Sequence, residues 1–446
     1  GVDVAFGTDG VRGLANRDLT AEHALGIGRA AARTLGHERW LIARDTRHSG
    51  PMLESALAAG LASEGARVEL LGIAPTPALA WLCTDLGVPG AMISASHNPF
   101  PDNGIKIFAA GGRKLTDRTE TSLLAALAEL DPGDPSGPTG RELGTIRTAG
   151  MGLDAWTDGL VASLEGRRLD GLTVVLDGSN GCNAHIAPDV LRSLGAEVHP
   201  VGDDPDGFNI NDGVGSTNPE ICGAAVVRFG ADVGLAFDGD ADRVVAVDHR
   251  GRIVDGDHMM ALLAIDRHQR GTLAGDTVVV TVMTNLGFHR AMAAAGINVE
   301  QTQVGDRYVL EALERGSWNL GGEQSGHVIL TDISRTGDGL LTGLHLLDLV
   351  QRSGRPLADL AADAMTTVPQ LLHNVRVQDR AVDVVAAVAP EIAAVESELG
   401  DDGRVLVRPS GTEPLVRVMV EAIAPGAAEA AVERLVAAVE RATEPA

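Results

Sequence analysis

Short apolar runs alternate with segments of helical periodicity through most of this chain. In the first round, strand-like runs lie at 40–43, 67–71 and 90–94, and helix-like segments lie at 50–64 and 77–86. This alternation is typical of a parallel or mixed sheet whose faces are covered by helices. The sequence therefore predicts an α/β fold.

The same pattern returns twice and then changes near the C-terminus. The later strand-like and helix-like segments lie, in chain order, at 172–176, 184–194, 233–237, 277–282 and 286–295. The last part differs, because two strand-like runs at 405–407 and 415–421 precede an alanine-rich helical segment at 426–441. We predict three similar mixed α/β sheet domains followed by a smaller α+β domain.

A stretch rich in Pro and Gly, Asp131–Gly140, indicates a loop or linker near the end of the first domain. The predicted domains are 1–150 with the serine-containing turn, 151–252 with an aspartate-rich loop, 253–366 with a glycine-rich polar loop, and 367–446 with an anion-binding loop.

The net charge of the chain limits the classes of partner that we expect it to bind. A formal net charge of −25 argues against binding nucleic acid or an anionic membrane through the overall field. The 3 cysteines form no C-x-x-C, so neither a disulfide framework nor a zinc site is expected, and we expect a cytoplasmic protein. We find no signal peptide and no apolar run long enough to span a bilayer.

The first polar cluster follows the strand-like run 90–94. It reads SASHNP, from Ser94 to Pro99, and Pro99 disfavours helical backbone at Asn98. These residues predict a tight turn that exposes its side chains, although an ordinary polar turn that closes a strand would have the same sequence pattern. Lys106 follows closely enough to bring an ammonium group back to the same turn.

The second cluster, DGDADR, places carboxylates at Asp238, Asp240 and Asp242, a donor set that suits a hard cation. A calcium EF-hand would need Gly and Glu where Arg243 and His249 stand, so that template fails. In a straight strand the outer two Cα atoms would lie about 13 Å apart, so the segment must curl to bind one ion. The alternative is a solvated acidic turn.

Two more glycine-rich clusters suit a sugar phosphate. GGEQSGH at 321–327 carries side chains that can donate to and accept from sugar hydroxyls, and RPSGTEP at 408–414 has the arginine, hydroxyls and glycine of an anion nest. Either could also be a plain turn between strands. By contrast, the G-x-G-x-x-A pattern at 26–31 lies in a helical segment capped by Thr20, with no strand before it, so we reject a dinucleotide site.

Taken together, these segments resemble the motifs of the α-D-phosphohexomutase superfamily, in the same order and over nearly the whole chain. The matching segments are FGTDGVRG, SASHNP with NGIK, DGDADR, VGDRYV at 304–309, GGEQSGH and RPSGTEPLVRV. The resemblance implies four domains around a central cleft, the last of which closes over the substrate.

The resemblance also implies residue roles. Ser96 would carry a phosphoryl group and would bind one Mg²⁺ together with Asp238, Asp240 and Asp242. Arg243, Lys106 and Arg12 would offset the negative charge. Lys106 is the preferred general acid or base, with His97 and His327 as rivals. The residues expected to bind the sugar or its second phosphate are Asp306, Arg307, Glu323, Ser325, His327, Arg408, Ser410, Gly411, Thr412 and Arg417.

The implied reaction interconverts glucosamine 6-phosphate and glucosamine 1-phosphate, through a bisphosphorylated sugar, on the way to UDP-N-acetylglucosamine. The choice of amino sugar rests mainly on FGTDGVRG, VGDRYV and GGEQSGH. The same chemistry on glucose or mannose phosphates, a magnesium phosphatase and a non-catalytic phosphosugar-binding regulator stay open as alternatives. Relatives of this kind are often dimers, so a homodimer is a further open prediction.

Overall fold

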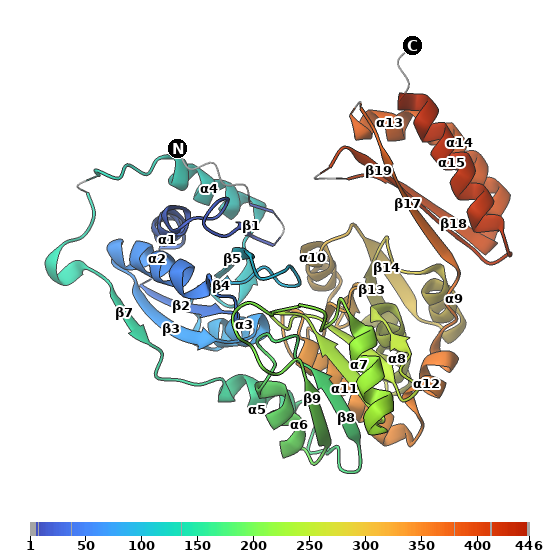
Figure 1. Cartoon of the computed structure of the whole chain (residues 1–446), viewed down its shortest axis with the longest axis horizontal. Helices are drawn as coiled ribbons and strands as arrows, with labels where there is room; N and C mark the ends of the chain where they lie inside the picture. The colour runs from blue at the N-terminus through green and yellow to red at the C-terminus, as the bar shows by residue number, and fades with distance from the viewer. Residues whose placement is uncertain are drawn as a thin grey trace. The chain divides into compact units, whose positions relative to one another are not determined.

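The computed structural model describes residues 6–7, 9–36, 38–134, 136–378, 380–410 and 413–443. Contacts divide the chain into two units, Gly1–Met283 with Ile297–Ala364, and Thr284–Gly296 with Met365–Ala446. The first unit holds three sheets of the mixed α/β kind, and the second holds a smaller sheet (Figure 1).

The first sheet has seven strands, and its main path runs in the order β1-β5-β4-β2-β3-β7, with β6 paired to β5. Strands β2, β3, β4 and β7 run parallel, whereas β5 is antiparallel to β1, β4 and β6. The strands are β1 (Val11–Leu14), β2 (Arg39–Arg44), β3 (Arg67–Ile73), β4 (Gly90–Ile93), β5 (Asp102–Ala109), β6 (Arg113–Lys114) and β7 (Thr145–Thr148).

Helices cover both faces of this sheet. Alternate residues of β2 divide between two cores, because successive strand side chains point to opposite faces. Trp40 and Ile42 join the core under α1, α2 and α4, and Leu41 and Ala43 join the core under α3. The helices are α1 (Ala21–Leu35), α2 (Gly50–Ser63), α3 (Thr76–Leu86) and α4 (Asp117–Ala128).

The G-x-G-x-x-A pattern lies inside α1, as expected. Thr20 caps that helix by accepting a hydrogen bond from the backbone N–H of His23. A Cβ atom added to Gly28 would lie 2.4 Å from the carbonyl oxygen of Leu57 in α2. The glycine therefore serves close packing of two helices and not a nucleotide.

The second and third sheets complete the first unit. The second has the order β12-β11-β10-β8-β9 and the third the order β14-β13-β15-β16. Their strands are β8 (Thr173–Asp177), β9 (Glu197–Val201), β10 (Val233–Phe237), β11 (Val244–Asp248), β12 (Ile253–Val254), β13 (Thr277–Thr281), β14 (Asn298–Thr302), β15 (Gly321–Gly322) and β16 (Val328–Ile329).

The helices of these two sheets include one that joins them. Helix α11 is buried from Gly339 to Val350 except at His345, and it contacts β10 and β11 of the second sheet as well as β16 of the third. The helices are α5 (Asp154–Ala162), α6 (Ile186–Ser193), α7 (Pro219–Phe229), α8 (Gly256–Gln269), α10 (Asp306–Gly316), α11 (Gly339–Ser353) and α12 (Leu357–Ala364), and short 3-10 turns occupy Gly140–Glu142 and Ala274–Asp276.

The second unit is the smaller α+β part. Its three strands are antiparallel in the order β17-β19-β18, and its core is rich in valine. Its elements are α9 (Leu286–Ala295), β17 (Gln370–Arg376), α13 (Ala381–Ala387), α14 (Ala389–Leu399), a 3-10 turn at Gly400–Asp402, β18 (Gly403–Pro409), β19 (Leu415–Ala422) and α15 (Ala427–Thr443). The predicted fold class is confirmed, although α9, expected in the third domain, is grouped by its contacts with this unit.

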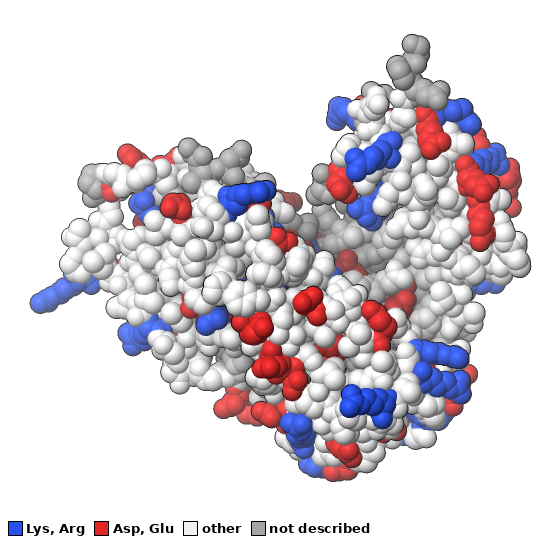
Figure 2. Space-filling view, in the orientation of Figure 1, with Lys and Arg blue, Asp and Glu red and all other residues white. Residues whose placement is uncertain are grey.

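The distribution of surface charge and the character of the helices bear on the expected partners. On the face shown in Figure 2, the coloured basic side chains stay scattered among acidic ones and form no continuous basic surface. Among the described helices, none combines the length and the apolar character needed to cross a bilayer.

Candidate active site

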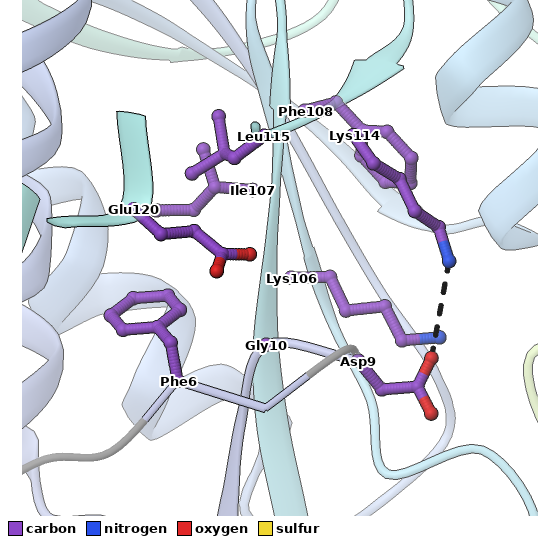
Figure 3. Close-up of a pocket in the computed structure, with 9 residues that line it drawn as sticks. All are labelled: Phe6, Asp9, Gly10, Lys106, Ile107, Phe108, Lys114, Leu115 and Glu120. Atoms are coloured by element: carbon purple, nitrogen blue, oxygen red, sulfur yellow. Dashed lines mark ion pairs between the residues drawn. The ribbon is translucent and has the colours of Figure 1, made fainter. Parts of the chain in front are cut away.

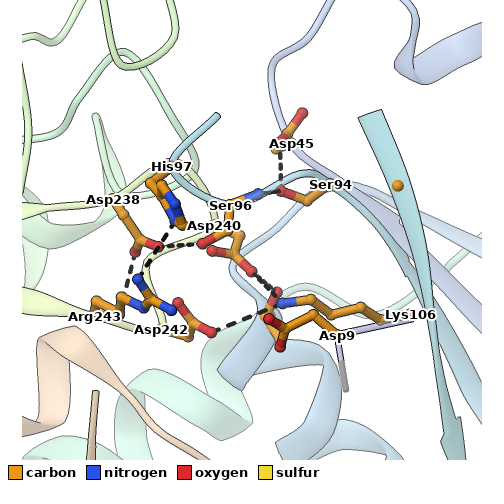
Figure 4. Close-up of polar contacts among 12 residues, drawn as sticks. Asp9, Asp45, Ser94, Ser96, His97, Lys106, Asp238, Asp240, Asp242 and Arg243 are labelled. Carbon is orange, nitrogen blue, oxygen red and sulfur yellow. Dashed lines mark hydrogen bonds and ion pairs between the residues drawn. The ribbon is translucent and has the colours of Figure 1, made fainter. Parts of the chain in front are cut away.

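Ser96 lies in the turn that follows β4, and its hydroxyl donates a 2.6 Å hydrogen bond to Oδ2 of Asp238 (Figure 4). The backbone N–H of Asn98 closes the turn on the carbonyl oxygen of Ala95. The predicted tight turn is confirmed, but the expected exposure of its side chains is wrong for Ser96, which is 1% exposed. The aspartate-rich loop covers it, since an added Cβ at Gly239 would lie 2.6 Å from the carbonyl oxygen of Ser96.

The aspartate-rich loop connects β10 to β11 and curls as predicted. Ala241 has a φ of 61°, and its N–H donates to the carbonyl oxygen of Asp238 at 3.1 Å. As a result, one carboxylate oxygen from each of Asp238, Asp240 and Asp242 lies within 4.8 Å of the others, and all three residues are buried.

The carboxylates of this loop need a counter-ion. Burial and the charges of Asp242 and Asp240 raise the pKa of Asp238 well above its usual range. Within the described residues, Oδ1 of Asp240 and Oδ1 of Asp242 are buried and have no hydrogen-bond partner. Three converging carboxylates with unpartnered buried oxygens fit a hard divalent cation, so this group could hold a metal.

Lys106 reaches the same loop from β5, because β5 runs back alongside β4. Its Nζ lies 3.2 Å from Oδ2 of Asp240 and 3.8 Å from Oδ2 of Asp242. Although burial disfavours the ammonium, these carboxylates raise the pKa of Lys106 above its usual range. Lys106 thus reaches the aspartate-rich loop that covers the serine turn, and the ammonium offsets part of the carboxylate charge.

Two further predicted residues, Arg243 and His97, contact each other beside the aspartate-rich loop. A guanidinium nitrogen of Arg243, Nη1, lies 3.4 Å from Nδ1 of His97, and the N–H of Arg243 donates to Oδ1 of Asp238. Burial and the charges of Arg243 and Arg12 lower the pKa of His97, which favours the neutral ring. Arg12, on β1, lies 3.6 Å from Asp9.

The glycine-rich segment 321–327 forms a tight hairpin between β15 and β16. His327 is buried between two carboxylates, with Nδ1 3.6 Å from Asp242 and Nε2 3.5 Å from Asp306. Glu323 accepts a 3.1 Å hydrogen bond from the N–H of Gly305, just before α10. Ser325 is exposed at the turn of the hairpin.

Asp306 also forms an ion pair with Lys114, a residue that sequence reasoning missed. Nζ of Lys114 lies 3.9 Å from Asp9. Figure 3 shows Lys114, Lys106 and Asp9 at one side of a pocket that Phe6 and Glu120 help to line. Lys114 thus connects the N-terminal segment with the start of α10.

The charge of Arg307 is balanced by carboxylates outside this cluster. Its guanidinium, whose side chain is 11% exposed, pairs with Asp117 at 2.8 Å and with Glu120 at 3.7 Å, and it donates to the carbonyl oxygen of Leu115. These pairs join α10 to α4, and the expectation that Arg307 lines the sugar-selecting loop stays a prediction.

The predicted phosphate segment lies in the second unit. Arg408 on β18 is directly opposite Arg417 on β19, and burial together with the charge of Arg417 lowers the pKa of Arg408. Ser410 donates its N–H to the carbonyl oxygen of Leu415 at 2.8 Å. Gly411 and Thr412 lie outside the described residues. That this segment faces Ser96 stays a prediction.

Several residues around Ser96 were not predicted, and one segment holds most of them. Thr76 donates a 2.6 Å hydrogen bond to Oδ2 of Asp240. Asp45 accepts from the hydroxyl of Ser94 and from Nε of Arg47. Asp45 and Arg47 directly follow β2, so the rule that polar residues after strands mark a site would have found them.

Comparison with known proteins identifies the family. Four phosphoglucomutase/phosphomannomutase models match in order: α/β/α domain I at residues 3–133, domain II at 154–251, domain III at 255–368 and the C-terminal domain at 372–441. The phosphoglucosamine mutase of Thermobifida fusca is 53% identical over 439 residues, which is 96% of either chain. The chain belongs to the phosphoglucosamine mutase family. It is accordingly a phosphohexomutase, an isomerase that transfers a phosphoryl group within a sugar phosphate.

Solved structures of phosphohexomutases share the fold. A phosphoglucomutase/phosphomannomutase family protein from Burkholderia thailandensis has a TM-score of 0.81 and 25% identity, and the match covers 99% of this chain and 98% of that one. The structure of Aspergillus fumigatus N-acetylphosphoglucosamine mutase in complex with GlcNAc-6P and magnesium has a TM-score of 0.66 and 18% identity, over 99% and 96% of the two chains.

Proposed function

We propose that this phosphohexomutase interconverts glucosamine 6-phosphate and glucosamine 1-phosphate and that Ser96 carries the transferred phosphoryl group. The observation that carries the proposal is the 2.6 Å hydrogen bond from Ser96 to Asp238, inside a buried cluster of three aspartates. The preference for the amino sugar is supported by relatives named phosphoglucosamine mutase at 52–53% identity.

The cation in the aspartate cluster is Mg²⁺ in this proposal. Asp238, Asp240 and Asp242 would hold it together with the phosphate on Ser96, and two oxygens of the trio have no partner among the residues that the structure describes. A bound Mg²⁺ supplies charge neutralisation and Lewis-acid polarisation of the phosphoryl oxygens. The fungal relative with GlcNAc-6P and magnesium supports this choice.

The reaction proceeds in two transfers. In the first, the bond from phosphorus to Oγ of Ser96 breaks, the bond from phosphorus to O1 of the sugar forms, and the proton of O1 ends on Ser96. The bisphosphate then turns around. In the second, the bond from O6 to phosphorus breaks, phosphorus bonds Ser96 again, and the serine proton passes to O6, which leaves glucosamine 1-phosphate.

The charged neighbours stabilise these transfers. Phosphoryl transfer depends mainly on positioning and charge neutralisation, which Lys106, Arg243 and Arg12 supply near Ser96. Lys106 is the preferred proton carrier because it lies within 3.2 Å of Asp240 in the same cluster, with His97 and His327 as rivals.

The remaining predicted residues bind the rest of the substrate in this scheme. The sugar hydroxyls are held by residues of the hairpin and of the start of α10, and the second phosphate is bound by residues of β18, β19 and the turn between them. These residues are Asp306, Glu323, Ser325, Arg408, Ser410, Gly411, Thr412 and Arg417. We place the enzyme in the cytoplasm, as a homodimer, with its product leading to UDP-N-acetylglucosamine.

Replacing the carrier tests the proposal. Ser96→Ala is expected to abolish turnover of glucosamine 6-phosphate while the protein stays folded, and intact mass is expected to show one phosphoryl group that maps to Ser96 in the wild type only. Ser122→Ala, an exposed serine on α4, is the matched control and should retain full activity. Full turnover in Ser96→Ala would refute the role of this serine.

Substrate assays separate the alternatives. Glucosamine, glucose and mannose 6-phosphates are assayed side by side with Mg²⁺, and the amino sugar is expected to give the highest kcat/KM. A higher value for glucose or mannose phosphate would assign the enzyme to that sugar instead. Stoichiometric release of inorganic phosphate would indicate a phosphatase, and absence of turnover on all three would indicate a binding protein.

A further inference from the structure

The backbone of the serine turn is held in an unusual conformation. Ser96 has a φ of 52°, in the left-handed region that residues with a side chain rarely adopt. Such a conformation persists only where the surrounding structure fixes it. The turn therefore needs partners for its carbonyl groups and its N–H groups.

Arg47 supplies most of the carbonyl partners. Its side chain is fully buried. Nη2 donates to the carbonyl oxygens of Ser96 at 3.1 Å and Asn98 at 3.0 Å. Nη1 donates to those of Pro99 at 2.5 Å and Asp102 at 3.1 Å. One guanidinium thus satisfies four carbonyl groups along the turn.

The amide side of the turn is reached by the same residue through two others. Nε of Arg47 donates to Oδ2 of Asp45 at 2.9 Å, and the same oxygen accepts from the hydroxyl of Ser94 at 2.6 Å. The oxygen of that hydroxyl accepts the N–H of Ser96 at 3.0 Å. Arg47 therefore holds both sides of the peptide backbone around Ser96.

Asn211, from a loop of the second sheet, binds some of the same carbonyl groups of the serine turn. Its Nδ2 donates to the carbonyl oxygen of Ser96 at 2.8 Å and to that of Asn98 at 3.1 Å. These are two of the four carbonyl groups that Arg47 binds. Asn211 comes from the loop between β9 and α7 and is itself fixed, because its N–H donates to the carbonyl oxygen of Ser179 at 2.9 Å.

We propose that Arg47 and Asn211 are positioning residues that aim Oγ of Ser96 at the aspartate cluster. The proposal rests on the proposed role of Ser96 as the phosphoryl carrier. The five donors of a guanidinium in a fixed fork make these bonds together, and the single ammonium of a lysine cannot replace them. All five N–H donors of the Arg47 guanidinium and both N–H donors of the Asn211 amide bond protein groups, so their loss acts on transfer and not on substrate binding.

The test compares two variants with two matched controls. Arg47→Lys is expected to lower kcat about 100-fold, the scale of a reacting group misplaced by about 1 Å. Asn211→Ala, which removes two of the shared bonds, is expected to lower kcat about tenfold. KM for glucosamine 6-phosphate should stay within about twofold of the wild type in both, because neither side chain provides uniform substrate binding. Arg168→Lys and Asn298→Ala, at exposed positions, should match the wild type.

Single-turnover transfer from the phosphorylated enzyme to the sugar gives the decisive rate. A slow transfer with unchanged KM and with a melting temperature like that of the controls supports the positioning role. Wild-type transfer in folded Arg47→Lys and Asn211→Ala, with Ser96→Ala inactive, would overturn it and leave the proposed function standing. Activity in Ser96→Ala would instead remove the proposed function itself. If Arg47→Lys fails to fold, Asn211→Ala decides.

Discussion

Around Ser96 the aspartates face cations, whereas Arg408 and Arg417 in the second unit face each other. Nζ of Lys106 lies 3.2 Å from Asp240 and 3.8 Å from Asp242. On β18 and β19 the two arginines are directly opposite, and within the described residues neither has a carboxylate partner. Like charges placed directly opposite on a sheet are destabilising. In the proposed scheme each region receives the charge it lacks: a cation among the three aspartates and an anion between the two arginines.

Arg404, in the same small sheet, shows the ordinary alternative. Nε of Arg404 lies 3.2 Å from Glu421, whose side chain is fully buried. A structural arginine of β18 is thus balanced within the sheet, while Arg408, four residues later, lies opposite another arginine. The difference between these arginines lies in their partners and not in their residue type.

The largest effect is expected from the cation side. Asp238→Asn should lower kcat about 100- to 1,000-fold, because it removes charge stabilisation at the transferred group. EDTA should stop the wild type and Mg²⁺ should restore it. In EDTA the variant should melt above the wild type, since one of three repelling carboxylates is gone. Asp212→Asn, an exposed position, is the control. Unchanged kcat in Asp238→Asn would break the comparison.

The next largest effect is expected from the anion side. Arg408→Ala should raise KM for glucosamine 6-phosphate about 10- to 100-fold, which corresponds to about 1.5–3 kcal/mol for a lost charge-assisted hydrogen bond. The change in kcat should be small, because this arginine is proposed to grip the phosphate that does not react. An unchanged KM in steady-state assays would remove the anion site from the scheme.

Thermal unfolding sharpens the contrast between Arg404 and Arg408. Arg404→Ala leaves the buried carboxylate of Glu421 without its cation, although the N–H of Leu286 still donates to it, and should cost about 1–3 kcal/mol of unfolding free energy. Arg408→Ala relieves the repulsion with Arg417 and should keep or raise the melting temperature. Inorganic phosphate should raise the melting temperature of the wild type and not that of Arg408→Ala. Equal destabilisation by the two substitutions would show that both arginines are structural.

The smallest effect concerns Arg307, whose charge is already balanced. Arg307→Ala should cost about 0.5–1 kcal/mol of unfolding free energy, because its pairs with Asp117 and Glu120 are partly exposed to solvent. KM for glucosamine 6-phosphate should change less than about twofold. A tenfold rise in KM, measured beside Arg118→Ala at an exposed position of α4 as the control, would support a place for Arg307 in the sugar site.

Sequence patterns predicted the elements that follow simple periodicity. Apolar runs located β2, β8, β10 and β13, and helical periodicity located α2, α3 and α9 within a few residues. Strand β5 was missed because two polar residues, Asn103 and Lys106, interrupt its apolar run. Strand β17 was missed because most of its side chains are exposed, and β15 and β16 are only two residues long.

Residue types and their spacing also predicted much of the chemistry of the site. Asp238, Asp240 and Asp242 alternate in a loop that directly follows a buried strand, and such spacing predicts both the cation and the need to curl. The serine turn, Lys106 and Arg243 were found in the same way. Residue type and spacing suffice here because the ligands of a small ion come from a few neighbouring positions.

Tertiary structure alone decided what meets across the fold. Ser96 bonds a residue 142 positions away, and Thr76 bonds one 164 positions away. Arg47 and Asn211 share two carbonyl groups although they come from different sheets. The ion pair between Arg307 of α10 and Asp117 of α4 likewise depends on the packing of distant segments. Local sequence sets which groups a segment offers, but hydrogen bonds between distant segments depend on how the sheets pack, and no short-range pattern encodes that.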